Sequence, residues 1–191
     1  MERHLYQAQA RETFAELGKP AEPEPRVEKA LRSFAPPPPM AKLEIARLHV
    51  SGFVEDGLDS ETLSRAIGHS PQSAKLGERG NVVLAAHRDT FFAGLKDVRT
   101  GDAIEVEAAD GKVYRYKVTR ILIIDPTEDW VLKSDPSRNM LTLITCYPFQ
   151  FIGSAPNRLV VQAEPVGSST VPSGSLLSRD RKHARSASEG I

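Results

Sequence analysis

The sequence predicts an all-β domain, either a barrel or a sandwich, that occupies the centre of the chain. About seven short apolar runs between Lys42 and Glu164 are separated by turn residues, as is typical of strands. Several of these runs alternate apolar and polar positions, the pattern of a strand with one buried face. Helical patterns are few and short, which favours layers of strands over an α/β arrangement.

Composition limits the class of protein. The 191 residues suffice for one domain with a sizeable core plus tails. The 25 basic and 25 acidic residues balance, so no overall field indicates nucleic acid or an anionic membrane surface as a partner. The single cysteine, Cys146, excludes an intramolecular disulfide and cannot form a zinc site alone. No apolar run approaches the roughly 20 residues of a membrane helix, and no secretory signal segment opens the chain.

Residues 1–40 form the first predicted region, a helix followed by a proline-rich linker. Gly18 and Pro20 end the helical pattern. The linker is dominated by proline and charge, which predicts an extended, semi-rigid spacer. The apolar residues that recur at roughly helical spacing in the helix are Leu5, Ala8, Phe14 and Leu17.

Residues 41–165 form the predicted β domain, and residues 166–191 a tail. The tail is rich in serine and glycine and ends in a basic cluster, so it cannot bury enough apolar surface to offset its ordering entropy. We predict that it is disordered. A solvated tail without a partner is favoured over a tail that contacts anionic lipid or nucleic acid.

The first half of the β domain contains two predicted strands and a helix. Apolar positions alternate, with one polar gap, through residues 42–50, which predicts a strand. Residues 58–71 predict one short helix, capped by Asp59 or Ser60 and ended by glycine and proline. The nearly all-apolar run at residues 81–89 predicts a strand that ends in charge.

The second half is predicted to contain a helical turn and five strands. Residues 93–102 indicate the helical turn. Two alternating runs surround the dipeptide Asp110-Gly111, which is the strongest hairpin signal in the sequence. Three more strands are expected at residues 130–133, 140–146 and 158–164.

Cys146 is the candidate nucleophile. It ends the run 140–146, beside a proline-containing loop, where a scaffold can present a reactive side chain. The two-residue period of a strand places Cys146 on the same face as Thr142 and Ile144. Free cysteine is also among the most buried residue types, so packing in the core is the alternative.

Two further residues complete a possible catalytic set. His87 follows an apolar run that gives way abruptly to charge, and histidine is the side chain suited to trading a proton with a thiol. The alternative for His87 is a surface histidine at a strand end. Arg158 opens the last apolar run and is either simply exposed or returns beside Cys146 if the last two strands are neighbours. A guanidinium there stabilises a developing oxyanion.

The sequence contains no motif for the other common classes of catalytic or binding site. The P-loop, dinucleotide, zinc-protease and nucleophile-elbow patterns are all absent from the sequence. One cysteine and scattered histidines supply too few metal ligands. Glu55, Asp56 and Asp59 lie near one another, but a solvated turn and a helix cap explain them equally well. We therefore predict no metal site and no cofactor, with calcium modulation unsupported.

Three separated motifs resemble those of sortases. The segment "TLITC", ending at Cys146, resembles the family's TLxTC signature, and "AAHRDT" around His87 resembles its histidine motif. Arg158 matches the arginine that begins the family's final strand. The resemblance covers residues 42–164, and the pattern "TCYPFxFIGSAPxR" is most like class D sortases. One departure is Ala86, where many relatives carry glycine, which matters only if the backbone there needs a positive φ.

The resemblance implies a closed eight-stranded β-barrel with one or two short helices, plus the N-terminal helix. It also implies a cysteine transpeptidase. Cys146 would attack a Leu-Pro-X-Thr-Gly/Ala-type sorting signal and form a thioacyl enzyme, and His87 would protonate the departing amine and deprotonate the incoming one. Arg158 would stabilise the oxyanion. The acceptor amine would come from cell-wall peptide or a pilin lysine.

The resemblance also suggests contacts and a location. Thr145 would line the substrate groove, with Ala86, Thr142 and Trp130 as further candidates, and Trp130 is equally well a pocket wall or a core residue. Surface proteins or pilins would be the substrates, at the extracytoplasmic face of a bacterial cell membrane. The N-terminal anchor usual in sortases is not in this chain, and the simplest account is that it was removed and Met1 replaces it.

Two alternatives stay open. A hydrolytic cysteine peptidase of the same fold would use the same three residues and release the thioacyl intermediate to water. A non-catalytic peptide-binding barrel would keep the fold without the chemistry. The N-terminal helix would inhibit if it lay over the groove, although nothing in its composition demands that.

Overall fold

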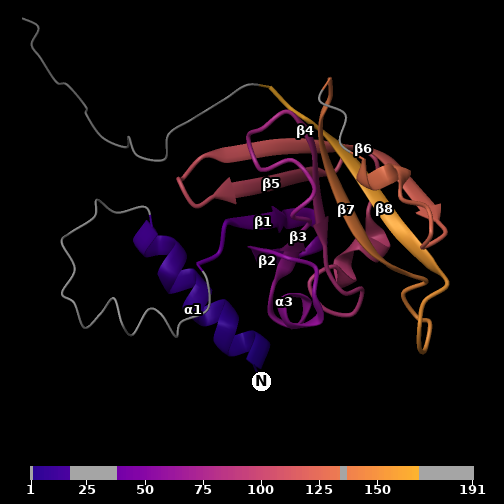
Figure 1. The fold of residues 1–191 in the computed structure, drawn as a ribbon, viewed down its shortest axis with the longest axis horizontal. Helices are drawn as coiled ribbons and strands as arrows, with labels where there is room; N and C mark the ends of the chain where they lie inside the picture. Colours follow the sequence, from indigo (N-terminus) through magenta and orange to yellow (C-terminus); the bar gives the residue numbers. More distant parts are fainter. Residues whose placement is uncertain (1, 18–37, 134–136, 168–191) are drawn as a thin grey trace, which may run out of the picture.

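A computed structural model of the chain describes residues 2–17, 38–133 and 137–167 (Figure 1). Within these residues eight strands close into a barrel in the order β1-β2-β3-β4-β7-β8-β6-β5. This confirms the predicted all-β class and the eight-stranded closed barrel. Residues 18–37, which hold most of the predicted linker, and residues 168–191, which hold most of the tail predicted at 166–191, lie outside the described residues. The strands are β1 (Ala41–Ile45), β2 (Val50–Asp56), β3 (Ile67–His69), β4 (Gly80–Ala85), β5 (Ala103–Ala108), β6 (Val113–Ile124), β7 (Asn139–Tyr147) and β8 (Asn157–Pro165).

Strand pairing is mixed, and β7 occupies a central position in it. β7 pairs in parallel with β4 and antiparallel with β8. β2 and β3 are also parallel, and the remaining neighbours are antiparallel. β5 and β6 form the hairpin expected at Asp110-Gly111, where Gly111 adopts a φ of 80° that favours glycine.

Apolar side chains fill the barrel and form a second, smaller cluster on its outside. Leu141 and Leu143 of β7 lie in the barrel core, whereas Ile144 packs in the outer cluster. This alternation confirms the predicted faces of the cysteine strand. The η2 helix (Ala93–Asp97) and the residue before it add Leu95 and Phe92, both fully buried, to the barrel core.

The prediction of one continuous strand over residues 42–50 is wrong. The chain instead forms β1, the 3-10 helix η1 (Ala46–Leu48) and the start of β2, and Ile45 pairs with Val50 across the turn. His49 has a φ of 53°, which reverses the chain direction. The polar gap in the alternation therefore marks a tight turn.

Two other local predictions change. The segment 130–133 is the 3-10 helix η3 (Trp130–Leu132), not a strand. The helix predicted within 58–71 is α3 (Ser60–Arg65). It is shorter than predicted, because Ile67–His69 form the strand β3. Its predicted cap is confirmed, since the Thr62 N–H donates to Asp59 Oδ1 at 2.9 Å.

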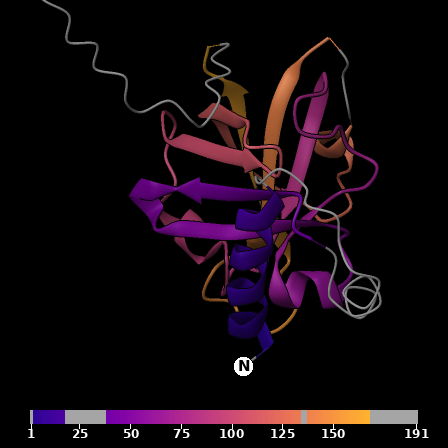
Figure 2. The ribbon, with the colours of Figure 1, turned by 90° about the vertical axis from the view of Figure 1, so that its left-hand side faces the viewer.

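The N-terminal helix α1 (Glu2–Leu17) packs on β2 and α3 (Figure 2). Its buried face consists of Tyr6 and Ala10 with part of Phe14, which lies 5.6 Å from the Phe53 ring. Of the four apolar residues noted in the sequence, only Phe14 joins this contact, and Leu5, Ala8 and Leu17 are exposed. Among the described helices none is long and apolar enough to cross a bilayer.

A buried polar cluster fixes α1 to the barrel. The Arg65 guanidinium contacts the carboxylate of Glu55 at 3.0 Å and lies 5.5 Å from the centre of the Tyr6 ring. Burial and the neighbouring Glu55 carboxylate raise the pKa of Tyr6, so its hydroxyl stays protonated. Gln7 adds two bonds, donating to the Arg65 carbonyl at 2.7 Å and accepting from the Phe53 N–H at 3.3 Å.

Asp102 joins η1 to the turn before β5 and should make stability depend on pH. Bonds of 2.6 Å from Arg47 Nε and Nη2, with the Arg99 N–H, hold the pKa of this carboxylate below its usual range. A lowered native pKa stabilises the fold above the unfolded value of about 3.9, and this contribution is lost as the pH falls through the native pKa.

Asp102→Asn should therefore unfold more easily than wild type at pH 7, and the difference should shrink towards pH 3. Urea titrations across this pH range measure it. Asp110→Asn is the control, because Lys112 also lowers the pKa of Asp110 but both side chains are exposed and screened by solvent. A difference for Asp102→Asn that stays constant from pH 7 to pH 3 would contradict the assignment.

Candidate active site

The pairing of β7 with β8 brings Cys146 next to Arg158. The two residues are direct register partners in this antiparallel pair. Side chains of such partners emerge on the same face, with Cβ atoms about 4.5–5.5 Å apart. The last two strands are thus neighbours, which is the condition under which Arg158 was predicted to lie beside Cys146.

The parallel pairing of β4 with β7 brings His87 to the same rim. Ala85 is the register partner of Ile144, and the Ala86 N–H donates to the Ile144 carbonyl at 3.3 Å, which extends the pairing by one residue. Because both strands run in the same direction, the next position sets His87 level with Cys146. Three adjacent strand ends, those of β4 and β7 and the start of β8, therefore meet at one edge of the barrel (Figure 1).

The exposure of these residues suits chemistry better than core packing. Cys146 is a free thiol of intermediate burial, on the outer face of β7. His87 is exposed and Arg158 is half-buried. A nucleophilic thiol needs access to a substrate, which a fully buried cysteine lacks.

Backbone carbonyls orient the Arg158 side chain. Its Nη1 donates to Ala155 at 3.2 Å and to Asn157 at 3.0 Å, which holds the guanidinium at the start of β8. The Thr127 hydroxyl and backbone N–H lower the pKa of Asp125, with a smaller contribution from the Arg158 charge, and Arg158 forms no ion pair among the described residues. Arg158 therefore keeps donors available for a substrate oxyanion.

Thr145 and Ala86 lie beneath the site. Thr145 is 3% exposed, and its hydroxyl donates to the Ala86 carbonyl at 2.8 Å. This bond ties the strand of the nucleophile to the residue before His87. Ala86 packs in the barrel core, and among the described residues other than glycine only His49 has a positive φ, so alanine fits position 86 without strain. Their predicted role in substrate binding stays a prediction.

An apolar cluster continues from the catalytic face. Ile144 and Val160 extend from the same outer faces as Cys146 and Arg158, and Val131 of η3 covers them. η3 is tethered because Asn81 Nδ2 donates to the Val131 carbonyl at 2.9 Å. Thr142, another predicted substrate contact, is fully buried and donates to Asn81 Oδ1 at 2.7 Å.

Trp130 lies at the surface of η3. It is 43% exposed, so the core interpretation does not hold. Its indole N–H donates to Glu128 at 2.8 Å, and the Arg120 guanidinium lies 5.9 Å from the ring centre. A role as a wall of the substrate groove stays a prediction.

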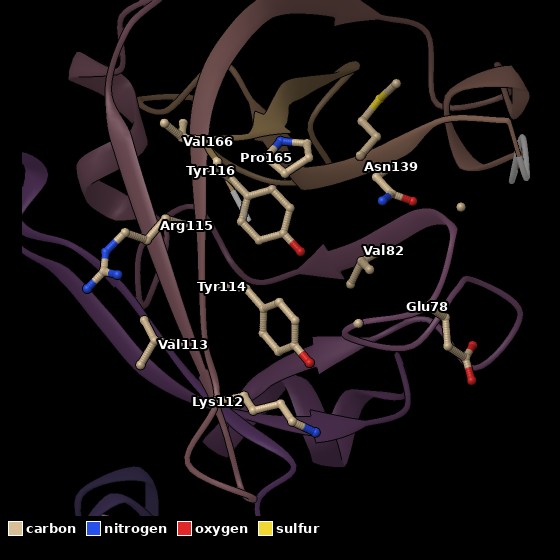
Figure 3. Close-up of a pocket in the computed structure, with 14 residues that line it drawn as sticks. Glu78, Val82, Lys112, Val113, Tyr114, Arg115, Tyr116, Asn139, Pro165 and Val166 are labelled. Carbon is tan, nitrogen blue, oxygen red and sulfur yellow. The ribbon is translucent and has the colours of Figure 1, made fainter. Parts of the chain in front are cut away.

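A pocket of about 310 Å³ lies at the other end of the barrel (Figure 3). It is lined by the start of β4 and β7 and by the two tyrosines Tyr114 and Tyr116. None of the predicted catalytic residues lines it. Cys146 lies instead on the outer face of the sheet, at the end of β7.

The acidic residues considered for calcium have separate partners. Glu55 pairs with Arg65, Asp56 contacts His69 Nδ1 at 2.8 Å, and Asp59 caps α3. Within the described part of the chain, no three metal-ligating side chains are grouped to hold an ion.

Comparison with known proteins identifies the family. The model of the sortase domain matches residues 43–166, which span the barrel from β1 to β8. The chain belongs to the sortase family. Sortases are cysteine transpeptidases, so the family's chemistry uses a cysteine side chain of the type found at position 146.

Two curated relatives are similar over the barrel. Sortase D of Bacillus subtilis (strain 168) is 29% identical over 124 residues, covering 65% of this chain and 62% of the relative. Sortase A of Streptococcus agalactiae serotype III (strain NEM316) is 26% identical over 136 residues, covering 66% and 53% respectively. The chain thus aligns with less than two thirds of the length of each relative.

Solved sortase structures share the fold. The Clostridium perfringens Sortase D5 transpeptidase superposes with a TM-score of 0.67 at 22% identity, covering 86% of this chain and 98% of that one. Sortase C-1 from Actinomyces oris gives a TM-score of 0.62 at 28% identity, covering 86% and 98%. The barrel and its strand order are therefore those of sortases.

Two residues with long-range polar bonds, Asn81 under η3 and Arg88 next to His87, were missed by sequence reasoning. Asn81 joins β4, β7 and η3 through its amide, and a polar residue opening an apolar strand was the available signal. Arg88 donates to two carbonyls of the loop between β7 and β8, and its position next to His87 was the available signal.

Thr145→Val tests the bond between the two catalytic strands. The change removes one hydroxyl at nearly constant volume, and we expect it to lower the free energy of unfolding by about 1–2 kcal/mol and to slow acyl transfer. Chemical denaturation and a transfer assay measure the two effects. Thr119→Val is the control, since Thr119 is an exposed residue and the bond from its hydroxyl to the Gln162 carbonyl is 3.4 Å long. Equal behaviour of the two variants would contradict the proposed importance of the bond.

Proposed function

We propose that the chain is a transpeptidase that cleaves a Leu-Pro-X-Thr-Gly/Ala-like sorting signal and transfers the protein to an amine. The observation that carries this proposal is the register pairing of Cys146 with Arg158, beside the strand that leads to His87. This pairing brings a thiol, an imidazole and a guanidinium to one rim, which supports their proposed roles as nucleophile, proton carrier and oxyanion donor. Membership of the sortase family supports the class of chemistry.

The first half-reaction forms a thioacyl enzyme. The Cys146 thiolate attacks the carbonyl carbon after threonine, and the Sγ–C bond forms as the carbonyl oxygen becomes negative. Arg158 donates hydrogen bonds to that oxyanion. The C–N bond then breaks, and protonated His87 gives its proton to the departing amine.

The second half-reaction reverses these roles. An incoming amine attacks the thioacyl carbon, and neutral His87 takes a proton from its nitrogen. Arg158 again stabilises the oxyanion. The C–S bond breaks, the new amide is released, and Cys146 returns as the thiolate. Thiol, imidazole and guanidinium complete this cycle, so the proposal calls on no cofactor and no metal.

The outer apolar cluster is the proposed binding surface for the apolar part of the signal. Ile144, Val160 and Val131 continue from the catalytic pair along the sheet. Leu132 and Trp130, both more than 40% exposed on η3, supply a further apolar wall. Thr142 acts from below this surface through Asn81, which holds η3 in place.

The proposed setting is the extracytoplasmic face of a bacterial cell membrane, and the proposed class is that of the class D sortases. The substrates are surface proteins or pilins, and the acceptor is a cell-wall amine or a pilin lysine. The similarity to Sortase D of Bacillus subtilis and the Cys-Tyr-Pro-Phe segment after the nucleophile support this assignment.

A panel of fluorogenic Leu-Pro-X-Thr-Gly/Ala peptides, with and without an added amine, tests the function. We expect amine-dependent ligation that Cys146→Ala abolishes and that Arg158→Ala lowers by roughly 10²–10³-fold, as for loss of an oxyanion donor. Arg115→Ala is the control, because Arg115 pairs with Glu105 at the surface of the β5–β6 hairpin. Cleavage without ligation would favour the hydrolytic peptidase. Peptide binding with no reaction would favour the non-catalytic barrel.

Removal of residues 1–38 tests whether α1 inhibits. α1 packs on β2 and α3, and β3 and β4 separate β2 from the cysteine strand β7 in the barrel. We expect the shortened chain to transfer no faster than the full chain and to melt at a lower temperature, because Phe53 and the buried Glu55 lose their cover. A clear gain in rate after removal would show that α1 restrains the site.

A further inference from the structure

We propose that Arg88 is a positioning residue that holds the loop between β7 and β8 against the His87 segment. This loop, residues 148–156, connects β7, which carries Cys146 near its end, to β8, whose second residue is Arg158. The catalytic meaning of the inference rests on the proposed function, while its structural content does not.

The contact joins distant parts of the chain. Arg88 Nη2 donates to the Phe151 carbonyl at 2.5 Å and to the Gly153 carbonyl at 3.2 Å. The donor and its acceptors are 63 and 65 positions apart in sequence. A charged donor makes each of these bonds stronger than a bond between neutral groups.

The tip of the loop is poorly fixed by packing. Residues 150–154 are exposed, and the Ile152 side chain is 96% exposed. Gly153 adopts a φ of 95°, and the bond from the Phe151 N–H to the Pro148 carbonyl is 3.4 Å long. Apolar burial therefore stabilises the tip very little. Arg88 holds it from one side, and Arg158 holds Ala155 from the other.

The base of the Arg88 side chain is rigid. The His87 carbonyl accepts the N–H groups of Thr90 at 3.3 Å and Phe92 at 3.2 Å, and Phe92 is fully buried in the barrel core. Arg88 thus extends from an anchored turn. Its head group transmits the position of that turn to the loop, and so fixes His87 relative to the Cys146–Arg158 pair.

The energetics favour a geometric role over a contribution to stability. Arg88 Nη1 is buried and has no hydrogen-bond partner within the described part of the chain. Burying an unpaired N–H is unfavourable, which offsets part of the gain from the two bonds at Nη2. Variants should therefore lose rate more than they lose stability. Misplacement of reacting groups by about 1 Å can cost about 10²-fold in rate.

The test compares Arg88→Ala and Arg88→Lys with the control Arg79→Ala, since Arg79 is exposed at the opposite end of β4. Four quantities are measured: kcat and KM for ligation, the rate of Cys146 alkylation by iodoacetamide across pH 6–9, amide hydrogen exchange in residues 148–156, and the melting temperature. Ethylguanidinium is then added to Arg88→Ala to replace the missing head group.

We expect Arg88→Ala to lower kcat by roughly 10–100-fold with little change in KM. Loop exchange should become faster, the alkylation profile should shift, and the melting temperature should match that of Arg79→Ala. Ethylguanidinium should restore part of kcat and slow loop exchange. Arg88→Lys should lie between wild type and Arg88→Ala, because an ammonium group reaches the two carbonyls less well than a planar guanidinium.

The proposal would be overturned if amide hydrogen exchange in residues 148–156 were as slow in Arg88→Ala as in the wild type. A loss of rate that ethylguanidinium does not reverse would also overturn it. If Arg88→Ala does not fold, Arg88→Lys decides by the same two criteria. If the wild-type chain shows no ligation, the proposed function fails, and loop exchange and alkylation still decide the role of Arg88.

Discussion

The register of three adjacent strands is the constraint on which the rest of this structure depends. β7 pairs in parallel with β4 and antiparallel with β8, so the end of β4, the end of β7 and the start of β8 meet at one rim. A slip of β7 by one residue would turn Cys146 into the barrel and bring a core side chain out. Leu141 and Leu143 oppose that slip because both are completely buried, and the Thr145 hydroxyl opposes it by its bond to Ala86.

The same alternation separates stability from function. Inward-facing residues of β7 and β8 form the barrel core, and their outward-facing neighbours carry the thiol, the guanidinium and an apolar surface. Rigidity and substrate contact are therefore assigned to opposite faces of the same strands. Buried polar groups join the two, since Asn81 and Thr142 connect the sheet to the η3 helix that covers the outer cluster. On another part of the barrel, the Glu55–Arg65 pair connects β2 and α3 to the helix α1.

Sequence reasoning succeeded where the deciding physics is local. Asp59 as a helix cap, Asp110-Gly111 as a hairpin turn and the two faces of residues 140–146 all follow from interactions within a few residues. It was wrong where tertiary contacts decide: residues 130–133 have the apolar content of a strand but form a 3-10 helix held by Asn81. The meeting of Cys146 with Arg158 depended on which strands are neighbours, and the family resemblance supplied that. Arg88 escaped notice because its acceptors are backbone carbonyls, which every residue has.

The arrangement also explains why the three catalytic side chains alone do not define the reaction. Transfer and hydrolysis use the same nucleophile, proton carrier and oxyanion donor, and differ in which nucleophile reaches the thioacyl carbon. We propose that this choice is made by the surfaces around Cys146, namely η3 with its apolar cluster and the β7–β8 loop. Both are held by long-range polar bonds, from Asn81 to Val131 and from Arg88 to Phe151 and Gly153. In this proposal the side chains that control the outcome, Asn81 and Arg88, act by positioning backbone and touch no reacting atom.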